Sequence, residues 1–196
     1  MPEALALGFD TSAAHCAAAL LTESRVLAHR QEDMGRGQAE RLFPLLEELL
    51  TEAGRDWRDL TVIGVGTGPG NFTGIRIAVA AARGLSLSLG IPAVGVGVTE
   101  AAALGLPRPC RVAVPSRAGE VIWQDFGMGP SAPEQGQLHM LPPGPAIALT
   151  RHPLPIAIGR IALSRANEPD LPRPAPIYLR PADAAPARDR GPVILT

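Results

Sequence analysis

The chain has 196 residues, of which 46% are hydrophobic and 19% are charged, and its formal net charge at pH 7 is −1. This composition is typical of a globular protein with a hydrophobic core, and the small net charge argues against a strongly basic nucleic-acid-binding surface. All 18 basic residues are arginine, and the absence of lysine excludes a Walker-type phosphate loop and Schiff-base chemistry.

The two cysteines, Cys16 and Cys110, are too few for a disulfide framework or a structural zinc site. The first residues lack the basic segment of a secretory signal, and we expect no apolar stretch of membrane-spanning length. The sequence therefore predicts a cytoplasmic protein with free thiols and no membrane association.

The prolines are distributed unevenly, with four in the first hundred residues and seventeen after them. This change predicts two lobes. We expect a regular α/β lobe over residues 1–105, and a smaller second lobe with a proline-rich C-terminal tail over residues 106–196.

The first lobe opens with three predicted strands, over residues 4–9, 16–21 and 25–29. The first strand ends at Asp10, which is followed by Thr11 and Ser12. Such a group can bind a phosphate or a metal-bound water, or it can simply form a turn, because these side chains bond their own backbone. His15 is expected to be a solvated residue at a strand end.

A helix is predicted over residues 38–53, because leucines repeat at helical spacing and Gly54 is placed to end the helix. Pro44 should kink this helix or mark its first turn. Phe43 points away from the leucine stripe. It therefore either widens the core face of the helix or belongs to a second apolar surface that meets another protein.

The next segment is an apolar strand over residues 60–65, a glycine-rich loop, and a helix over residues 73–89. Glycines at 66, 68, 70 and 74 allow sharp turns and close approaches of the backbone. Asn71 or Thr73 can cap the helix. A strand, a glycine-rich turn and a helix N-terminus can together bind an anion, but glycines also persist in purely structural turns. Small residues are dense in this helix, so a second close packing partner is plausible.

The chain continues with a strand over residues 93–96 and a helix that starts at residue 99. Three hairpin-ordered strands followed by alternating helices and strands differ from a dinucleotide-binding fold. The second lobe is predicted to contain a hairpin from residues 111–114 and 120–126. Further short strands are expected at 146–149 and 156–158, a short helix at 160–166, and an extended tail over 172–196.

Several motifs closely resemble the TsaB (YeaZ) family, and they cover nearly the whole chain. They are Asp10-Thr11-Ser12, Glu40-Arg41-Leu42-Phe43-Pro44-Leu45-Leu46, Gly66-Thr67-Gly68-Pro69-Gly70-Asn71-Phe72-Thr73-Gly74-Ile75-Arg76, Gly84-Leu85-Ser86, Gly90-Ile91-Pro92-Ala93-Val94-Gly95-Val96, Arg117-Ala118-Gly119-Glu120-Val121 and Tyr178-Leu179-Arg180-Pro181-Ala182-Asp183. The resemblance implies an α/β fold of the actin-like ATPase type (ASKHA, ribonuclease H-like) with two lobes and a reduced second lobe. The chain departs from the family pattern at Gln38, where histidine is common, and at Pro115, where aspartate is usual.

The resemblance also implies a function. The family is the non-catalytic paralogue of TsaD, which transfers threonylcarbamoyl to adenosine 37 of tRNA, and its members activate TsaD as partner subunits. The implied partners are a TsaD-like catalytic subunit and a TsaE-like ATPase, with tRNA contacted only indirectly and a homodimer using the same two helices. The implied interface residues are Arg41, Phe43, Leu45, Glu48, Ala80, Ala81, Arg83 and Leu87.

No catalytic residue and no metal ligand is expected, because the metal-binding helix of the catalytic relative carries a His-x3-His pair that this sequence lacks. The residues of the vestigial phosphate or nucleotide loop would be Asp10, Thr11, Ser12, Gly66, Gly68, Gly70 and Thr73. We expect no tightly bound cofactor, with ATP binding only weakly or within a complex. The alternative is an ATP-dependent phosphotransferase of the sugar-kinase-like fold, which would need a second phosphate loop and a carboxylate base.

Overall fold

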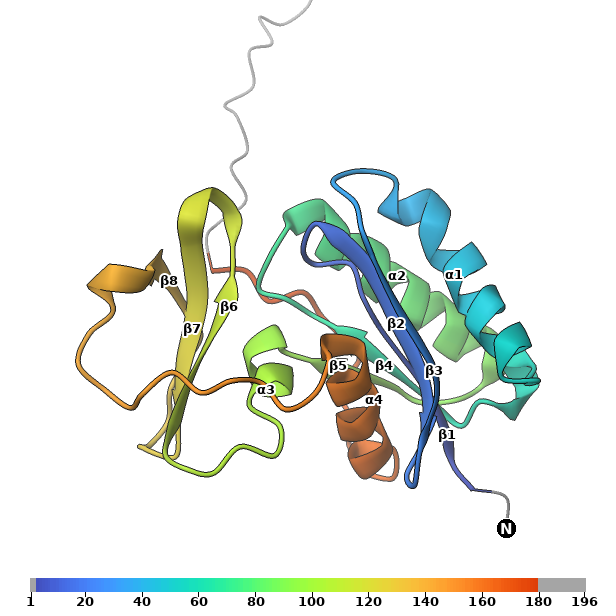
Figure 1. The fold of residues 1–196 in the computed structure, drawn as a ribbon. Helices are drawn as coiled ribbons and strands as arrows, with labels where there is room; N and C mark the ends of the chain where they lie inside the picture. Colours follow the sequence, from blue (N-terminus) through green and yellow to red (C-terminus); the bar gives the residue numbers. More distant parts are fainter. Residues whose placement is uncertain (1–2, 180–196) are drawn as a thin grey trace, which may run out of the picture.

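The larger of two β-sheets forms the centre of the computed structural model, which describes residues 3–179 (Figure 1). Its strand order is β3-β2-β1-β4-β5. The strands are β1 (Leu5–Asp10), β2 (His15–Thr22), β3 (Val26–Asp33), β4 (Val62–Gly66) and β5 (Ala93–Val96). The first three strands pair antiparallel, and β4 and β5 continue the sheet in parallel. This confirms the predicted strand order along the chain and the α/β class.

Both faces of this sheet are covered. Leu5, Leu7 and Phe9 of β1 pack towards helices α1 (Gln38–Glu52) and α2 (Phe72–Leu89), whereas Ala6 packs towards the opposite face. Figure 1 shows α1 and α2 on one side of the sheet and α4 on the other. Burial on both faces explains why β1, β2 and β4 are largely continuous apolar runs, whereas the edge strand β3 is mostly polar.

Helix α4 (Leu154–Arg165) covers the second face together with the short helix α3 (Val98–Ala102). It packs close to the sheet because Gly8 lacks a side chain. A Cβ there would lie 2.7 Å from the backbone nitrogen of Gly159. The predicted strand at 156–158 is therefore wrong, and the predicted helix at 160–166 begins earlier. Segment 106–196 thus supplies a helix to the sheet of the first lobe.

The second sheet contains β6 (Cys110–Pro115), β7 (Glu120–Phe126) and β8 (Glu134–Gln137) in that order. The β6–β7 hairpin confirms the prediction. Strand β8 was not predicted, and of the strand predicted at 146–149 the structure has only a single bridge, between Ile147 and Arg111. Short 3-10 turns lie at Trp57–Asp59, Arg117–Gly119 and Leu138–Met140.

An ion pair between a buried arginine and a partly buried aspartate joins β6 to β7 in the second lobe. The guanidinium of Arg111 donates to both carboxylate oxygens of Asp125, at 2.6 and 2.7 Å, and to the carbonyl of Pro142 at 2.6 Å. It also lies over the ring of Trp123, 4.5 Å from the ring centroid. The hydrogen bonds of Arg111 lower the pKa of the Asp125 carboxyl. This cluster supplements a small hydrophobic core.

Helix α2 is long and apolar enough to cross a membrane by length and composition alone, so the expectation that no stretch reaches this length is wrong. Its inner side is nevertheless buried against the sheet through Ile75, Ala78, Val79 and Ala82. Burial of one side is typical of a helix that packs on a sheet. The outer side of α2 is exposed to solvent.

Candidate functional site

The glycine-rich loop connects the end of β4 to the start of α2 and lies against the turn that follows β1. Asn71 is the N-cap of α2, because its side chain accepts a hydrogen bond from the Gly74 amide at 2.9 Å. Thr73 is exposed in the first turn of the helix. The N-cap is therefore Asn71 and not Thr73, the other residue that the sequence offered for this role.

Asp10 is completely buried at the end of β1. Its Oδ1 accepts hydrogen bonds from the amide and the hydroxyl of Ser12, both at 2.9 Å, and lies 2.7 Å from Nε2 of His15. Its Oδ2 has no hydrogen-bond partner within the described residues and faces Gly66, where a Cβ would overlap it. Both oxygens are thus enclosed by the described chain, and the bonds of Oδ1 to Ser12 form a turn. The expectation that His15 is solvated is wrong, because it contacts this carboxylate.

Close packing accounts for glycine at several loop positions. A Cβ on Gly70 would overlap the carbonyl of Ser12, and one on Gly74 would overlap the carbonyl of Thr11. Ser12 and Thr11 also form hydrogen bonds with the loop. The Asn71 amide donates to the Ser12 carbonyl at 2.6 Å, and the Thr11 hydroxyl donates to the Gly74 carbonyl at 2.6 Å.

Gly68 has a φ of +85°, a backbone conformation that favours glycine. We call residues 66–74 together with residues 10–12 the clasp. It fixes the start of α2 to the end of β1. Anion binding by the clasp stays a prediction.

The outer surface of α1 and α2 carries exposed apolar and small side chains. Leu87 is 87% exposed and Phe43 is 43% exposed, although the Phe43 ring also contacts Trp57. Ala80 and Gly84 are exposed one helical turn apart, and a Cβ on Gly84 would meet no atom within 4 Å. We call this surface the α1–α2 face. Phe43 therefore lies on an exposed apolar surface.

Three residues that were predicted to lie at the partner interface have other contacts in the structure. Leu45 is fully buried in the core, so it does not lie on the α1–α2 face. Ala81 is only partly exposed and packs against the core. Arg83 is exposed, but its Nε donates to the carbonyl of Pro174 at 2.8 Å. This last contact could not be predicted from spacing along the helix.

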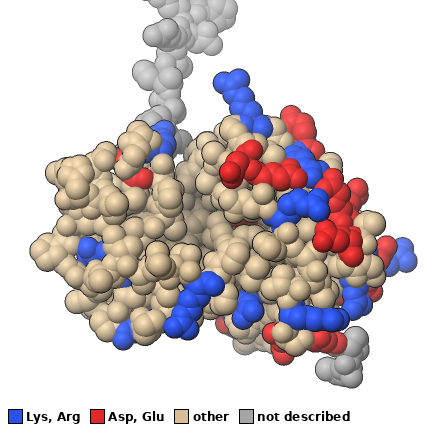
Figure 2. All heavy atoms as spheres, viewed as in Figure 1, with Lys and Arg blue, Asp and Glu red and all other residues tan. Residues whose placement is uncertain are grey.

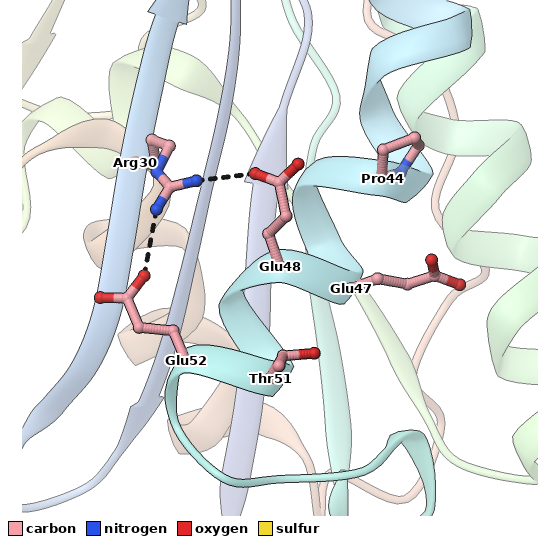
Figure 3. Close-up of a pocket in the computed structure, with 6 residues that line it drawn as sticks. All are labelled: Arg30, Pro44, Glu47, Glu48, Thr51 and Glu52. Atoms are coloured by element: carbon pink, nitrogen blue, oxygen red, sulfur yellow. Dashed lines mark hydrogen bonds and ion pairs between the residues drawn. The ribbon is translucent and has the colours of Figure 1, made fainter.

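A network of charges links the exposed side of α1 to the edge strand β3. Arg41 donates to Glu32 and Glu48, and Arg30 donates to Glu48 and Glu52. The hydrogen bonds from Arg41 lower the pKa of both Glu32 and Glu48. Figure 3 shows Arg30 between Glu48 and Glu52, in a hollow that is also lined by Pro44, Glu47 and Thr51. Figure 2 shows acidic side chains and arginines gathered on the side of the molecule that carries α1.

The other reactive groups are few. Within residues 3–179, no group of three or more His, Cys, Asp and Glu side chains could hold a metal ion. Cys16 and Cys110 are buried free thiols, and burial raises the pKa of the Cys16 thiol to about 11. The Cys16 thiol is therefore not suited to act as a nucleophile.

A family model described as TsaD, tRNA N6-adenosine threonylcarbamoyltransferase, matches residues 26–127, more than half of the chain. The chain belongs to this family. Its TsaB/YeaZ character is supported by the curated protein TsaB of Escherichia coli K12, described as a tRNA threonylcarbamoyladenosine biosynthesis protein. The two are 35% identical over 125 residues, which cover 61% of this chain and 54% of the relative. The chain thus matches about half the length of that TsaB.

Two solved structures from Pseudomonas aeruginosa have the same fold. One is described as an uncharacterized protein with similarity to peptidase YeaZ, and it superimposes with a TM-score of 0.70 at 26% identity. The other, YeaZ itself, gives a TM-score of 0.68 at 26% identity. Each match covers 90% of this chain and all of the other chain. The predicted TsaB/YeaZ resemblance and the actin-like, ribonuclease H-like fold class are confirmed.

Proposed function

We propose that this chain is a non-catalytic partner subunit that activates a TsaD-like transferase in threonylcarbamoyl transfer to adenosine 37 of tRNA in the cytoplasm. The observation that carries the proposal is the α1–α2 face. Leu87 and the small residues Ala80 and Gly84 are exposed on the outer side of α2 within the described residues, and small residues let a second helix approach closely. Exposed apolar patches of this kind are typical of protein interfaces.

The proposed occupant of the α1–α2 face is the TsaD-like subunit. Because the matching family model is that of TsaD itself, such a partner would share the lobe that carries α1 and α2. Two related lobes can pair through equivalent helices around an approximate two-fold axis. The same geometry would allow two copies of this chain to pair, so a homodimer would compete with the complex.

The enclosure of Asp10 supports a role without chemistry of its own. A phosphotransferase of this fold would need this carboxylate to face a metal-bound water or a phosphate, whereas here both oxygens face the chain. We propose that the isolated chain binds ATP weakly or not at all, and that a TsaE-like ATPase supplies nucleotide chemistry in the complex. Acidic residues outnumber arginines on α1 and β3 and would repel RNA phosphates, so tRNA contact would be indirect.

The decisive experiment is reconstitution. The TsaD-like and TsaE-like subunits from the same genome would be assayed for threonylcarbamoyladenosine in tRNA with and without this chain. We expect co-purification with the TsaD-like subunit and modification only when the chain is present. Equal modification without it would contradict the proposal. So would micromolar ATP affinity of the isolated chain by calorimetry together with unaided phosphotransfer.

A further inference from the structure

The C-terminal part of the described chain lies beside α2. Arg83 donates to the carbonyl of Pro174, and Arg76 Nε donates to the hydroxyl of Tyr178 at 3.0 Å. Tyr178 follows Pro174 by four residues, whereas Arg76 precedes Arg83. Arg76 and Arg83 are two helical turns apart on the exposed side of α2. Segment 174–178 therefore runs antiparallel to the helix along its side. We call this segment the strap (red in Figure 1).

The strap is also attached to the sheet. The amide of Ile177 donates to the carbonyl of Thr67 at 2.8 Å. A Cβ on Gly95 would lie 3.2 Å from Cα of Pro174, which is buried. The strap thus packs against the carboxyl ends of β4 and β5.

An aromatic contact fixes the far end of the strap. The rings of Tyr178 and Phe72 lie 4.8 Å apart between centroids, and the guanidinium of Arg76 lies 3.7 Å from the centroid of Phe72. Contacts of this kind stabilise partly exposed sites modestly, and here they add to the hydrogen bonds. The attachment therefore depends on a few named side chains.

We propose that the strap is a third component of the docking surface, beside α1 and α2, and that its attachment by Arg76 and Arg83 sets the affinity for the partner. This inference rests on the proposed function. Ile177 and Tyr178 are 38% and 40% exposed, so the strap extends the apolar surface of α2 along its edge. Arg83 then acts by holding the strap in place and does not itself contact the partner.

The attachment and the docking are linked reciprocally. A TsaD-like subunit that covers both α2 and the strap binds the attached form more tightly than the detached form. Its binding must therefore stabilise the attached strap by the same factor. A loosened strap would lower affinity even when every residue of α1 and α2 is unchanged.

The test uses the full chain and the TsaD-like subunit from the same genome. Hydrogen exchange of the peptide that covers 174–179 reports attachment, and titration of the partner reports affinity. Tyr178→Ala removes the ring contact and the hydrogen bond, whereas Tyr178→Phe removes only the hydroxyl. Arg173→Ala is the matched control, because Arg173 is exposed next to the strap and has no hydrogen bond or ion pair within residues 3–179.

We expect Tyr178→Ala to speed exchange of the strap and to weaken partner binding, each about tenfold. Tyr178→Phe and Arg83→Ala should have smaller effects, and the variant that speeds exchange more should also weaken partner binding more. Arg173→Ala should change neither the exchange rate nor the affinity. Partner binding should slow exchange of the wild-type strap.

Faster exchange with affinity unchanged within about twofold would overturn the docking role. Unchanged exchange in both Tyr178→Ala and Arg83→Ala would overturn the attachment. If the wild-type chain does not bind the partner at all, the proposed function fails together with the docking role, while exchange of the free chain still decides the attachment separately.

Discussion

Gly66 lies against the carboxylate of Asp10 so closely that a Cβ on Gly66 would overlap Oδ2. This contact joins the end of β4 to the end of β1. The buried carboxylate in turn holds the residues that follow it, through its hydrogen bonds with Ser12 and its contact with His15. The clasp is therefore a unit of packing that positions α2.

Replacing Gly66 by alanine should destabilise the chain. The added methyl group must displace a buried carboxylate that cannot move without losing its hydrogen bonds, and overpacking of this kind costs about 1–3 kcal/mol. Urea unfolding would measure the loss. Gly84→Ala is the matched control in α2, where open space and helix propensity predict a gain of up to about 1 kcal/mol. Equal stability of the two variants would contradict this account of the clasp.

The α1–α2 face can be tested by adding charge to neighbouring residues of α2. Ala80→Arg should leave folding intact and prevent assembly with the TsaD-like subunit, because residue 80 is exposed. Ala81→Arg should instead lower the free energy of unfolding, because residue 81 packs against the core. Circular dichroism and size-exclusion chromatography would separate the two effects. Unfolding of Ala80→Arg would show that residue 80 belongs to the core.

The second lobe should depend on pH through Asp125. Its carboxyl has a lowered pKa because Arg111 donates to it. The contribution of the pair to stability is therefore complete above the ordinary pKa of about 4, and it is lost as the pH falls through the lower folded-state pKa.

We expect Asp125→Asn to cost about 1–3 kcal/mol near neutral pH. The difference from wild type should be constant between about pH 5 and 7 and smaller at about pH 3. Urea unfolding at these pH values would measure it. A difference that grows as the pH falls would contradict the assignment.

The contribution of α4 to the first sheet can be tested with a fragment. Residues 1–105 should not form a stable domain, because they expose the face of the sheet that Ile158 and its neighbours cover. In the full chain, Ile158→Ala should cost about 2–5 kcal/mol. A synthetic peptide covering 150–170 should partly restore chemical-shift dispersion to the fragment. Cooperative unfolding of the fragment alone would contradict the expectation.

The sequence predicted the first lobe well because its signals are local. Apolar runs, the leucine stripe of α1 and the glycines at 54 and 90 placed the strands and helices to within a few residues. The first part of α4 was wrongly assigned to a strand because residues 154–162 are apolar almost all round, and a helix buried on most sides has no polar face to reveal its period. Strand β8 lacks β-branched and aromatic residues, so no propensity marked it.

The site was predictable only where neighbours in sequence interact. The cap at Asn71 follows from a local rule. The glycines at 66 and 70 indicate close approaches, but the sequence does not show that these approaches are to Asp10 and Ser12. The attachment of Tyr178 to Arg76 joins distant segments that pattern alone cannot bring together. The contact between His15 and Asp10 is local, but no sequence pattern marks it. The family's C-terminal motif was recognised through Tyr178, but its residues from 180 onwards lie outside the described residues.

The chain leaves its first sheet at β5, builds the second lobe, and returns with α4 to close the sheet it had left. During synthesis, one face of the first sheet therefore stays exposed to water until α4, which ends at residue 165, has left the ribosome. That interval exposes Ala6 of β1, Ala19 and Leu21 of β2, and Val62 of β4 on the growing polypeptide. We expect it to be the stage at which chaperones bind and at which aggregation competes with maturation.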